Sequence, residues 1–261
     1  GSEMCIRDST VTADGKKVKY VHSIHELNDT TLWVSTVGEG IVKIILNKNG
    51  ITPTVKSATR IILDGGRLAS NYFFTSFQEN DSILWFGNRG YGAHRLNLET
   101  GKFTPYKFDN IVNSQMTNDI FAIYKNENGY WFATSSGLLH FNQEDSQHHN
   151  KVELLSKNTA HGILEDQQNN IWISTNQGLV RFNPKTHTSQ TYDRKNGLEV
   201  TEFSDGAFYK DIPTETLFFG GTNGFVAIKP NDYNMATYMP QISMKRLSIF
   251  GKEYNIHDFL Y

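Results

Sequence analysis

The strongest constraint on the fold is a motif that occurs five times within 261 residues. In each copy an apolar strand with an aromatic anchor is followed by a turn, a glycine and a second strand, as in IWISTNQGLVRF. A four-stranded propeller blade takes about 40–50 residues, which matches the spacing of these anchors, so the repeat predicts stacked β-propeller blades. The five anchors are Trp33, Trp85, Trp131, Trp172 and Phe218.

Each copy keeps the same columns of large and small side chains. The residue two positions after the anchor is always small, and a glycine always opens the following strand. One more strand lies upstream of each anchor, and a fourth is visible in several copies. Because a single blade cannot bury both of its faces, blades must stack, and we expect the anchors to form core rather than to stack on a ligand. The small residues and the glycines are Ser35, Gly87, Ala133, Ser174, Gly220, Gly40, Gly92, Gly137, Gly178 and Gly224.

Composition excludes several classes of partner. The net charge of −2 provides no clustered basic field, so we expect no nucleic-acid or anionic-membrane partner. The single cysteine, Cys5, excludes an internal disulfide and a cysteine-based zinc ribbon. No run of eighteen apolar residues is present, so the chain is predicted to hold no transmembrane segment. Residues 1–8 fit no pattern of the repeat and are expected to be a scar or a disordered leader.

A search for catalytic motifs finds none. G-x-S-x-G, a Walker-type loop and H-E-x-x-H are absent, and the turns before the tryptophans do not meet the Asp-box pattern of sialidase-like propellers. We therefore predict a non-enzymatic chain with no catalytic residue, no cofactor and no metal. The acid-amide clusters before each anchor are expected to form turns. His148 and His149 are expected in a solvated loop, and His22 and His25 should point to opposite faces of a regular strand.

The best copy, GILEDQQNNIWISTNQGLVRF (162–182), resembles the two-component regulator propeller repeat. The resemblance extends over about residues 18–232. NGLEVTEFSDGAFY (196–209) and LFFGGTNGFVAIKP (217–230) resemble the final blade in extracytoplasmic sensor regions of Bacteroidetes-type hybrid two-component systems. MPQISMKRLSIFGKEYN (239–255) is similar to the first strands of the tyrosine-rich β-sandwich that follows such propellers.

The resemblance implies an all-β chain in which residues 9–236 form five visible four-stranded blades of a seven-bladed β-propeller. Residues 237–261 would then start a truncated Ig-like β-sandwich. It also implies the periplasmic, ligand-sensing portion of a homodimeric hybrid two-component sensor kinase that responds to oligosaccharides and signals across the membrane. A protein-interaction scaffold and, with less support, a propeller lyase or glycosidase stay open as alternatives.

Propeller architecture also predicts where a ligand binds. If the strand before each anchor is innermost, the turns after the anchor strands and the connections between blades share one rim around the central axis. These loops carry amides, arginines and aromatic rings, which suit sugar hydroxyls and the C–H faces of sugar rings. The predicted ligand-binding residues are Arg67, Asn71, Arg89, Tyr91, Asn118, His161, Asn176, Gln177, Glu202 and Asn223.

Overall fold

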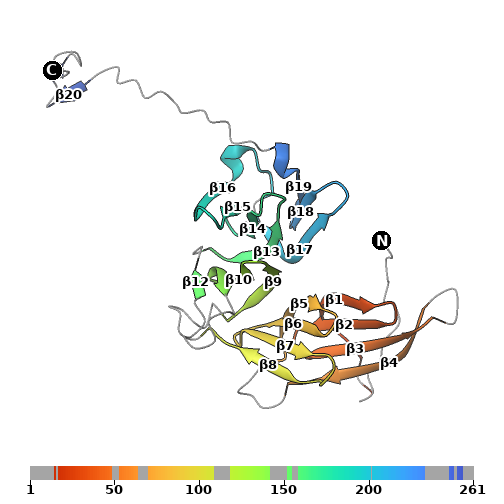
Figure 1. The fold of residues 1–261 in the computed structure, drawn as a ribbon. Helices are drawn as coiled ribbons and strands as arrows, with labels where there is room; N and C mark the ends of the chain where they lie inside the picture. The colour runs from red at the N-terminus through yellow and green to blue at the C-terminus, as the bar shows by residue number, and fades with distance from the viewer. Residues whose placement is uncertain are drawn as a thin grey trace. The chain divides into compact units, whose positions relative to one another are not determined.

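A computed structural model describes residues 15, 17–48, 53–63, 70–108, 118–141, 152–154, 158–200, 202–232, 247–249 and 252–254. The chain divides into two units, residues 1–230 and residues 231–261. Regular structure in the described residues is antiparallel β-sheet, with two short 3₁₀ turns, η1 (Arg194–Asn196) and η2 (Pro230–Asp232) (Figure 1). The predicted all-β propeller of five blades is therefore confirmed.

The first two blades are four-stranded meanders in which each strand pairs with the next one along the chain. Short turns join the strands, because each turn only has to reverse the chain between neighbours. The strands are β1 (Val21–Asn28), β2 (Thr31–Thr36), β3 (Ile41–Asn47), β4 (Thr54–Ile61), β5 (Phe73–Asn80), β6 (Ile83–Asn88), β7 (Ala93–Asn97) and β8 (Phe103–Tyr106).

The next three blades repeat this order, but the fifth has three strands among the described residues. In the second unit, β20 (Leu247–Ile249) and β21 (Lys252–Tyr254) form a hairpin. This hairpin lies inside the segment that is predicted to start a β-sandwich. The sandwich itself and the domain boundaries stay predictions. The remaining strands are β9 (Ile120–Asn126), β10 (Gly129–Thr134), β11 (Gly137–Phe141), β12 (Val152–Leu154), β13 (Ala160–Glu165), β14 (Ile171–Thr175), β15 (Gly178–Asn183), β16 (Thr188–Tyr192), β17 (Phe203–Asp211), β18 (Thr216–Gly221) and β19 (Gly224–Ile228).

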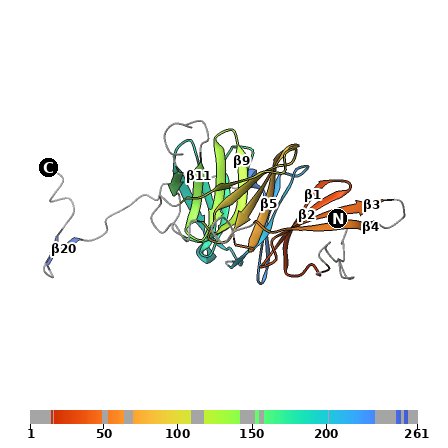
Figure 2. The same cartoon turned by 90° about the horizontal axis from the view of Figure 1, so that it is seen from below.

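The first strand of each blade is the innermost one, which is the condition on which the predicted rim depends. β1 packs against β5, β5 against β9, β9 against β13 and β13 against β17. β17 also lies against β5 and β9, so these first strands gather around a common axis. Figure 2 shows β1, β5 and β9 following one another in this order. Residues on the first strands can therefore act together although they lie far apart in the sequence.

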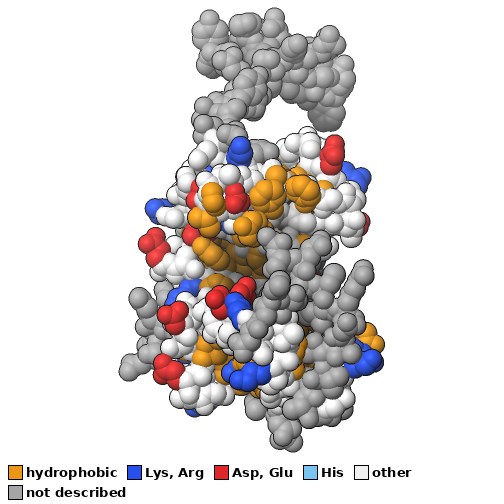
Figure 3. Space-filling model, turned by 90° about the vertical axis from the view of Figure 1, so that its right-hand side faces the viewer, with side chains coloured by type: hydrophobic (Ala, Val, Ile, Leu, Met, Phe, Trp, Pro, Cys, Tyr) orange, Lys and Arg blue, Asp and Glu red, His pale blue; other side chains and the backbone are white. Residues whose placement is uncertain are grey.

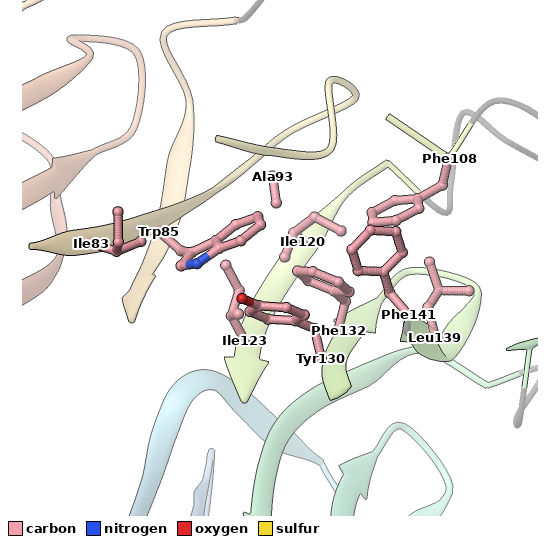
Figure 4. Close-up of a cluster of buried hydrophobic side chains, with 10 residues drawn as sticks. All are labelled: Ile83, Trp85, Ala93, Phe108, Ile120, Ile123, Tyr130, Phe132, Leu139 and Phe141. Carbon is pink, nitrogen blue, oxygen red and sulfur yellow. The ribbon is translucent and has the colours of Figure 1, made fainter. Parts of the chain in front are cut away.

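The anchors are buried between blades, as expected. Trp85 is fully buried, and its ring lies 5.0 Å from Tyr130 and 6.2 Å from Phe132, both on β10 of the next blade (Figure 4). The small residue after the anchor is needed for the same contact, because a Cβ on Gly87 would lie 2.5 Å from the carbonyl oxygen of Ile120. Both columns of the repeat are therefore packing requirements.

The fifth anchor is the exception. Phe218 is only half-buried, and its neighbours across the sheet include Tyr209 and Phe225, which are 63% and 67% exposed. Figure 3 shows hydrophobic side chains gathered on this part of the surface. Among the described residues no blade covers this face, whereas each tryptophan face is covered by the blade that follows.

The acid-amide clusters before the anchors form turns, and they also hold the indole N–H groups of the tryptophans. Trp172 donates to Asp166 at 2.8 Å, Trp85 donates to Glu79 at 2.7 Å, and Trp131 donates to an amide oxygen at 3.0 Å. In the first blade Leu27 occupies the position six residues before Trp33, and the buried indole nitrogen of Trp33 has no hydrogen-bond partner there. The carboxylates of Asp166 and Glu79 thus have a structural role, which is to accept the indole N–H groups of buried tryptophans.

Glu79 gives the fold a pH dependence that can be measured. Burial alone would raise the pKa of this carboxyl, but hydrogen bonds from Lys125 and Trp85 outweigh it and hold the pKa below its ordinary value of 4.5. The unfolded chain then takes up the proton at a higher pH than the folded protein does. The stabilisation is complete above pH 4.5 and is lost as the pH falls through the folded-state pKa.

We expect the free energy of unfolding of Glu79→Gln to lie below that of the parent protein at neutral pH, with the gap closing as the pH falls below 4.5. Urea titrations at a series of pH values measure both curves. Glu127→Gln, at an exposed turn position, should run parallel to the parent throughout. A gap for Glu79→Gln that stays constant down to pH 3 would contradict the assignment.

Candidate functional site

A β-bulge occurs near the start of every innermost strand. In β1, Val21 pairs with Thr36 and Ser23 with Ser35, which leaves His22 as the extra residue. The same shift occurs in β5, β9 and β13. A bulge turns the extra side chain out of the regular alternation, and bulges are frequent beside binding sites. The extra residues are His22, Phe74, Phe121 and His161.

These four extra residues all carry rings, and the rings form a continuous row across four blades. The ring centroids of His22 and Phe74 lie 5.3 Å apart, and those of Phe74 and Phe121 lie 5.1 Å apart. His161 follows at 6.1 Å from Phe121. All four side chains are half-buried, so each ring keeps part of its surface accessible. We call these four residues, together with Asp205, the bulge row.

Asp205 ends the row in the fifth blade. Here the bulge is larger, because Phe203 pairs with Gly221 and Phe208 with Phe219, so four residues stand opposite Gly220 alone. The carboxylate of Asp205 accepts a hydrogen bond from Nδ1 of His161 at 2.6 Å, and it is 29% exposed. This bond joins the innermost strands of the fourth and fifth blades.

The hydrogen bonds of the two imidazoles fix their orientation. Nδ1 of His22 lies 2.7 Å from the carbonyl oxygen of Phe74, which can only accept, so this nitrogen is the donor. Nδ1 of His161 likewise donates to Asp205. In the neutral imidazole the other nitrogen, Nε2, is then an acceptor. The row therefore combines two apolar ring faces with acceptor groups at both ends.

The predicted rim exists, and it lies directly beside the bulge row. Backbone N–H groups of the turns after the anchor strands donate to the connections that enter the next innermost strand. Gly38 and Gly40 both donate to the carbonyl of Asn71, Gly92 donates to Asn118 and Asn176 donates to Thr159, at 2.9–3.2 Å. These accepting residues lie two or three positions before a bulge residue, so the loops and the rings share one end of the innermost strands.

The structure places the predicted ligand-binding residues on this rim in different environments. The guanidinium of Arg89 lies 5.7 Å from the ring of Tyr72, and Lys107 lies 4.8 Å from the ring of Tyr91. The side chain of Asn118 is buried and accepts from the backbone of Phe108 at 2.8 Å, which ties two loops together.

The remaining predicted residues are mostly exposed. Gln177 accepts from Asn158 at 3.2 Å, and Glu202 accepts from Thr222 at 3.4 Å. Asn176 and Asn223 are exposed in the turns of the fourth and fifth blades. Arg67 lies outside the described residues. Of the ten predicted residues, the structure places only His161 in the bulge row, and ligand contact at any of them stays a prediction.

Alternation of side chains in the sequence did not single out His22, Phe74, Phe121 and Asp205 as candidate site residues. It predicted that His22 and His25 point to opposite faces, and this was wrong, because both contact β5: His22 through the carbonyl of Phe74 and His25 through Gln78 at 3.1 Å. The bulge at His22 itself changes the alternation. A usable signal was present, since each ring is the second residue of an innermost strand.

Nothing in the described residues resembles a metal centre: no three His, Cys, Asp or Glu side chains are grouped closely enough to hold an ion. Nor does any helix in the described part of the chain have the length and apolar character to cross a membrane. The site is instead an aromatic row with polar ends.

Comparison with known proteins supports the repeat assignment. Residues 154–177, which include the whole of β13 and β14, match the two-component regulator propeller. The predicted resemblance to this repeat is thereby confirmed. Histidine kinase P4 of Formosa agariphila is 28% identical over 67% of this chain and 16% of that protein.

Solved structures show the same fold. The extracellular domain of BT3049 from B. thetaiotaomicron, assigned as a hybrid two component system, superposes with a TM-score of 0.65 at 21% identity, over 95% of this chain and 34% of that one. The extracellular domain of BT4673 from the same organism gives 0.62 at 18% identity, over 94% and 32%. The chain thus spans about a third or less of the length of these three relatives, and it shares the propeller fold of the two extracellular domains.

Proposed function

We propose that this chain is the ligand-sensing portion of a hybrid two-component sensor kinase, that it works in the periplasm, and that the bulge row binds an oligosaccharide. The observation that carries the proposal is the row itself: Phe74 and Phe121 offer adjoining ring faces, and His161 and Asp205 lie at one end. Aromatic faces cover the C–H surfaces of sugar rings, while carboxylate and imidazole groups pair with hydroxyls. Similarity to histidine kinase P4 supports the signalling role.

A ligand on the row would touch side chains from several blades at once. Each ring belongs to a different blade, and the His161–Asp205 bond already links two of them. A ligand shifts an equilibrium between signalling states only if it binds one state more tightly than the other. We infer that the oligosaccharide favours one relative placement of the blades and that the remainder of a homodimeric parent transmits it across the membrane.

The test is binding of neutral tetrasaccharides with β-1,4, β-1,3 and α-1,4 linkages to the chain, by thermal shift and isothermal titration calorimetry. A saccharide at about 100 times its Kd should add about 2.7 kcal/mol to the free energy of unfolding. Phe74→Leu keeps apolar volume but removes a ring face, so we expect an affinity loss of about tenfold or more.

The matched control is Phe103→Leu, the same change at a half-buried position on β8, the outermost strand of the blade that holds Phe74. This variant should bind as the parent protein does. Equal losses in the two variants would reject the row as the binding surface, and release of shorter sugars during incubation would favour the glycosidase or lyase alternative.

A further inference from the structure

The charge of the bulge row restricts which oligosaccharides can bind there. We propose that Asp205 is a specificity-determining residue that selects uncharged saccharides and rejects those that carry carboxylate or sulfate groups. This inference rests on the proposed function, because it names the chemical class of ligand for the same site. It follows from the groups that the enlarged bulge of β17 brings to the end of the row.

The His161–Asp205 pair cannot attract an anion. With a neutral imidazole the pair carries one negative charge, and with a protonated imidazole it carries none. The carboxylate is 29% exposed, so a ligand can reach its remaining acceptor positions. A hydroxyl can donate to this carboxylate, whereas a ligand carboxylate at the same place would meet a like charge.

The other members of the row do not offset this charge. His22 donates Nδ1–H to a backbone carbonyl, and Phe74 and Phe121 are apolar. No lysine or arginine occupies the bulges near the start of the five described innermost strands. With neutral imidazoles the row is therefore neutral to negative along its whole length.

The loops around the row carry carboxylates besides the cations of Arg89 and Lys107, which lie against the rings of Tyr72 and Tyr91. Asp119 lies two residues before Phe121 and accepts from the hydroxyl of Ser135 at 3.0 Å, and Glu202 is exposed three residues before Asp205. Arg60, on the same rim, already binds the carboxylate of Glu39 at 3.0 Å, and its side chain is only 6% exposed. An anionic sugar would thus approach several carboxylates and find this guanidinium occupied.

The size of the effect follows from Coulomb attraction and repulsion at short range. Two unit charges 4 Å apart interact by about 1 kcal/mol even in bulk water, and more where the protein excludes water. A neutral saccharide should therefore bind at least about fivefold more tightly than a matched acidic one. The preference should shrink as salt rises, because the Debye length is about 10 Å at 0.1 M.

The experiment compares two matched pairs by calorimetry at low salt: cellotetraose with the β-1,4-glucuronan tetrasaccharide, and mannotetraose with the β-1,4-mannuronan tetrasaccharide. The parent chain should prefer the neutral member of any pair it binds. Asp205→Asn keeps the shape of the side chain and its contact with His161 but removes the charge. This variant should bind the acidic member of each pair more tightly than the parent does, so the ratio of the neutral to the acidic affinity should move towards one.

Glu127→Gln is the control, since it removes one exposed negative charge from the β9–β10 turn, at the other end of β9 from Phe121. It should leave the ratio unchanged. Equal or tighter binding of the acidic member by the parent chain overturns the selectivity and leaves oligosaccharide sensing intact. A ratio that Asp205→Asn does not change overturns the role of Asp205. Binding of none of the four sugars, together with none of the neutral panel, overturns both proposals.

Discussion

Replacing Asp166 with alanine should lower the free energy of unfolding by about 3–5 kcal/mol. The carboxylate is fully buried, and it accepts from the backbone of Gln168 and Asn170 at 2.9 Å each and from the indole of Trp172 at 2.8 Å. The guanidinium of Arg181 lies 3.7 Å away. Alanine would leave these donors buried without an acceptor. Each unsatisfied buried donor then lowers the stability of the folded protein by the full free energy of its desolvation.

Urea unfolding followed by tryptophan fluorescence measures the loss. Asp166→Asn should fall between the parent and the alanine variant, because the amide keeps one acceptor oxygen but brings N–H groups towards donors. The control is Asp29→Ala, whose side chain is 88% exposed and pairs with Lys48 at 3.4 Å. Exposed pairs contribute about 0–1 kcal/mol. Comparable losses for Asp29→Ala and Asp166→Ala would show that the indole cluster does not stabilise the blade.

The comparison between Asp166 and Leu27 shows why the sequence predicts the blades so well. Both stand six residues before a tryptophan, yet only Asp166 is an acceptor, and the indole nitrogen of Trp33 lacks a partner. The blade forms in both cases, because the aromatic anchor and the small residue after it fix the packing between blades. These requirements act at fixed positions of the repeat, so sequence alone reveals them.

The bulge row could not be predicted in the same way. Alternation of side chains assumes that residues i and i+3 face opposite sides of a strand, and an extra residue breaks that rule at a position that the alternation itself does not reveal. His22 and His25 show the error directly, since both reach β5. Asp205 was missed for a related reason, because its bulge is larger than those of the other four blades. The loops of the rim were predicted because blade topology alone determines where they meet.

Gly92→Ala should cost more stability than any other glycine-to-alanine change in its turn. Gly92 has a φ of +75°, and a Cβ added there would lie 2.1 Å from the carbonyl oxygen of Tyr106 on β8. A left-handed conformation costs about 1–2 kcal/mol for a residue with a side chain, and overpacking adds about 1–3 kcal/mol. The expected loss is therefore about 2–5 kcal/mol.

Gly90 provides the matched control within the same turn. Its φ is +76°, and an added Cβ would meet nothing within 4 Å, so Gly90→Ala tests the backbone conformation without the clash. It should lose about 1–2 kcal/mol in urea unfolding. Equal losses at the two positions would mean that β8 moves aside freely. A larger loss at Gly92 would mean that the β7–β8 pairing fixes the turn that carries Arg89 and Tyr91, and so holds these predicted ligand-binding residues at the rim.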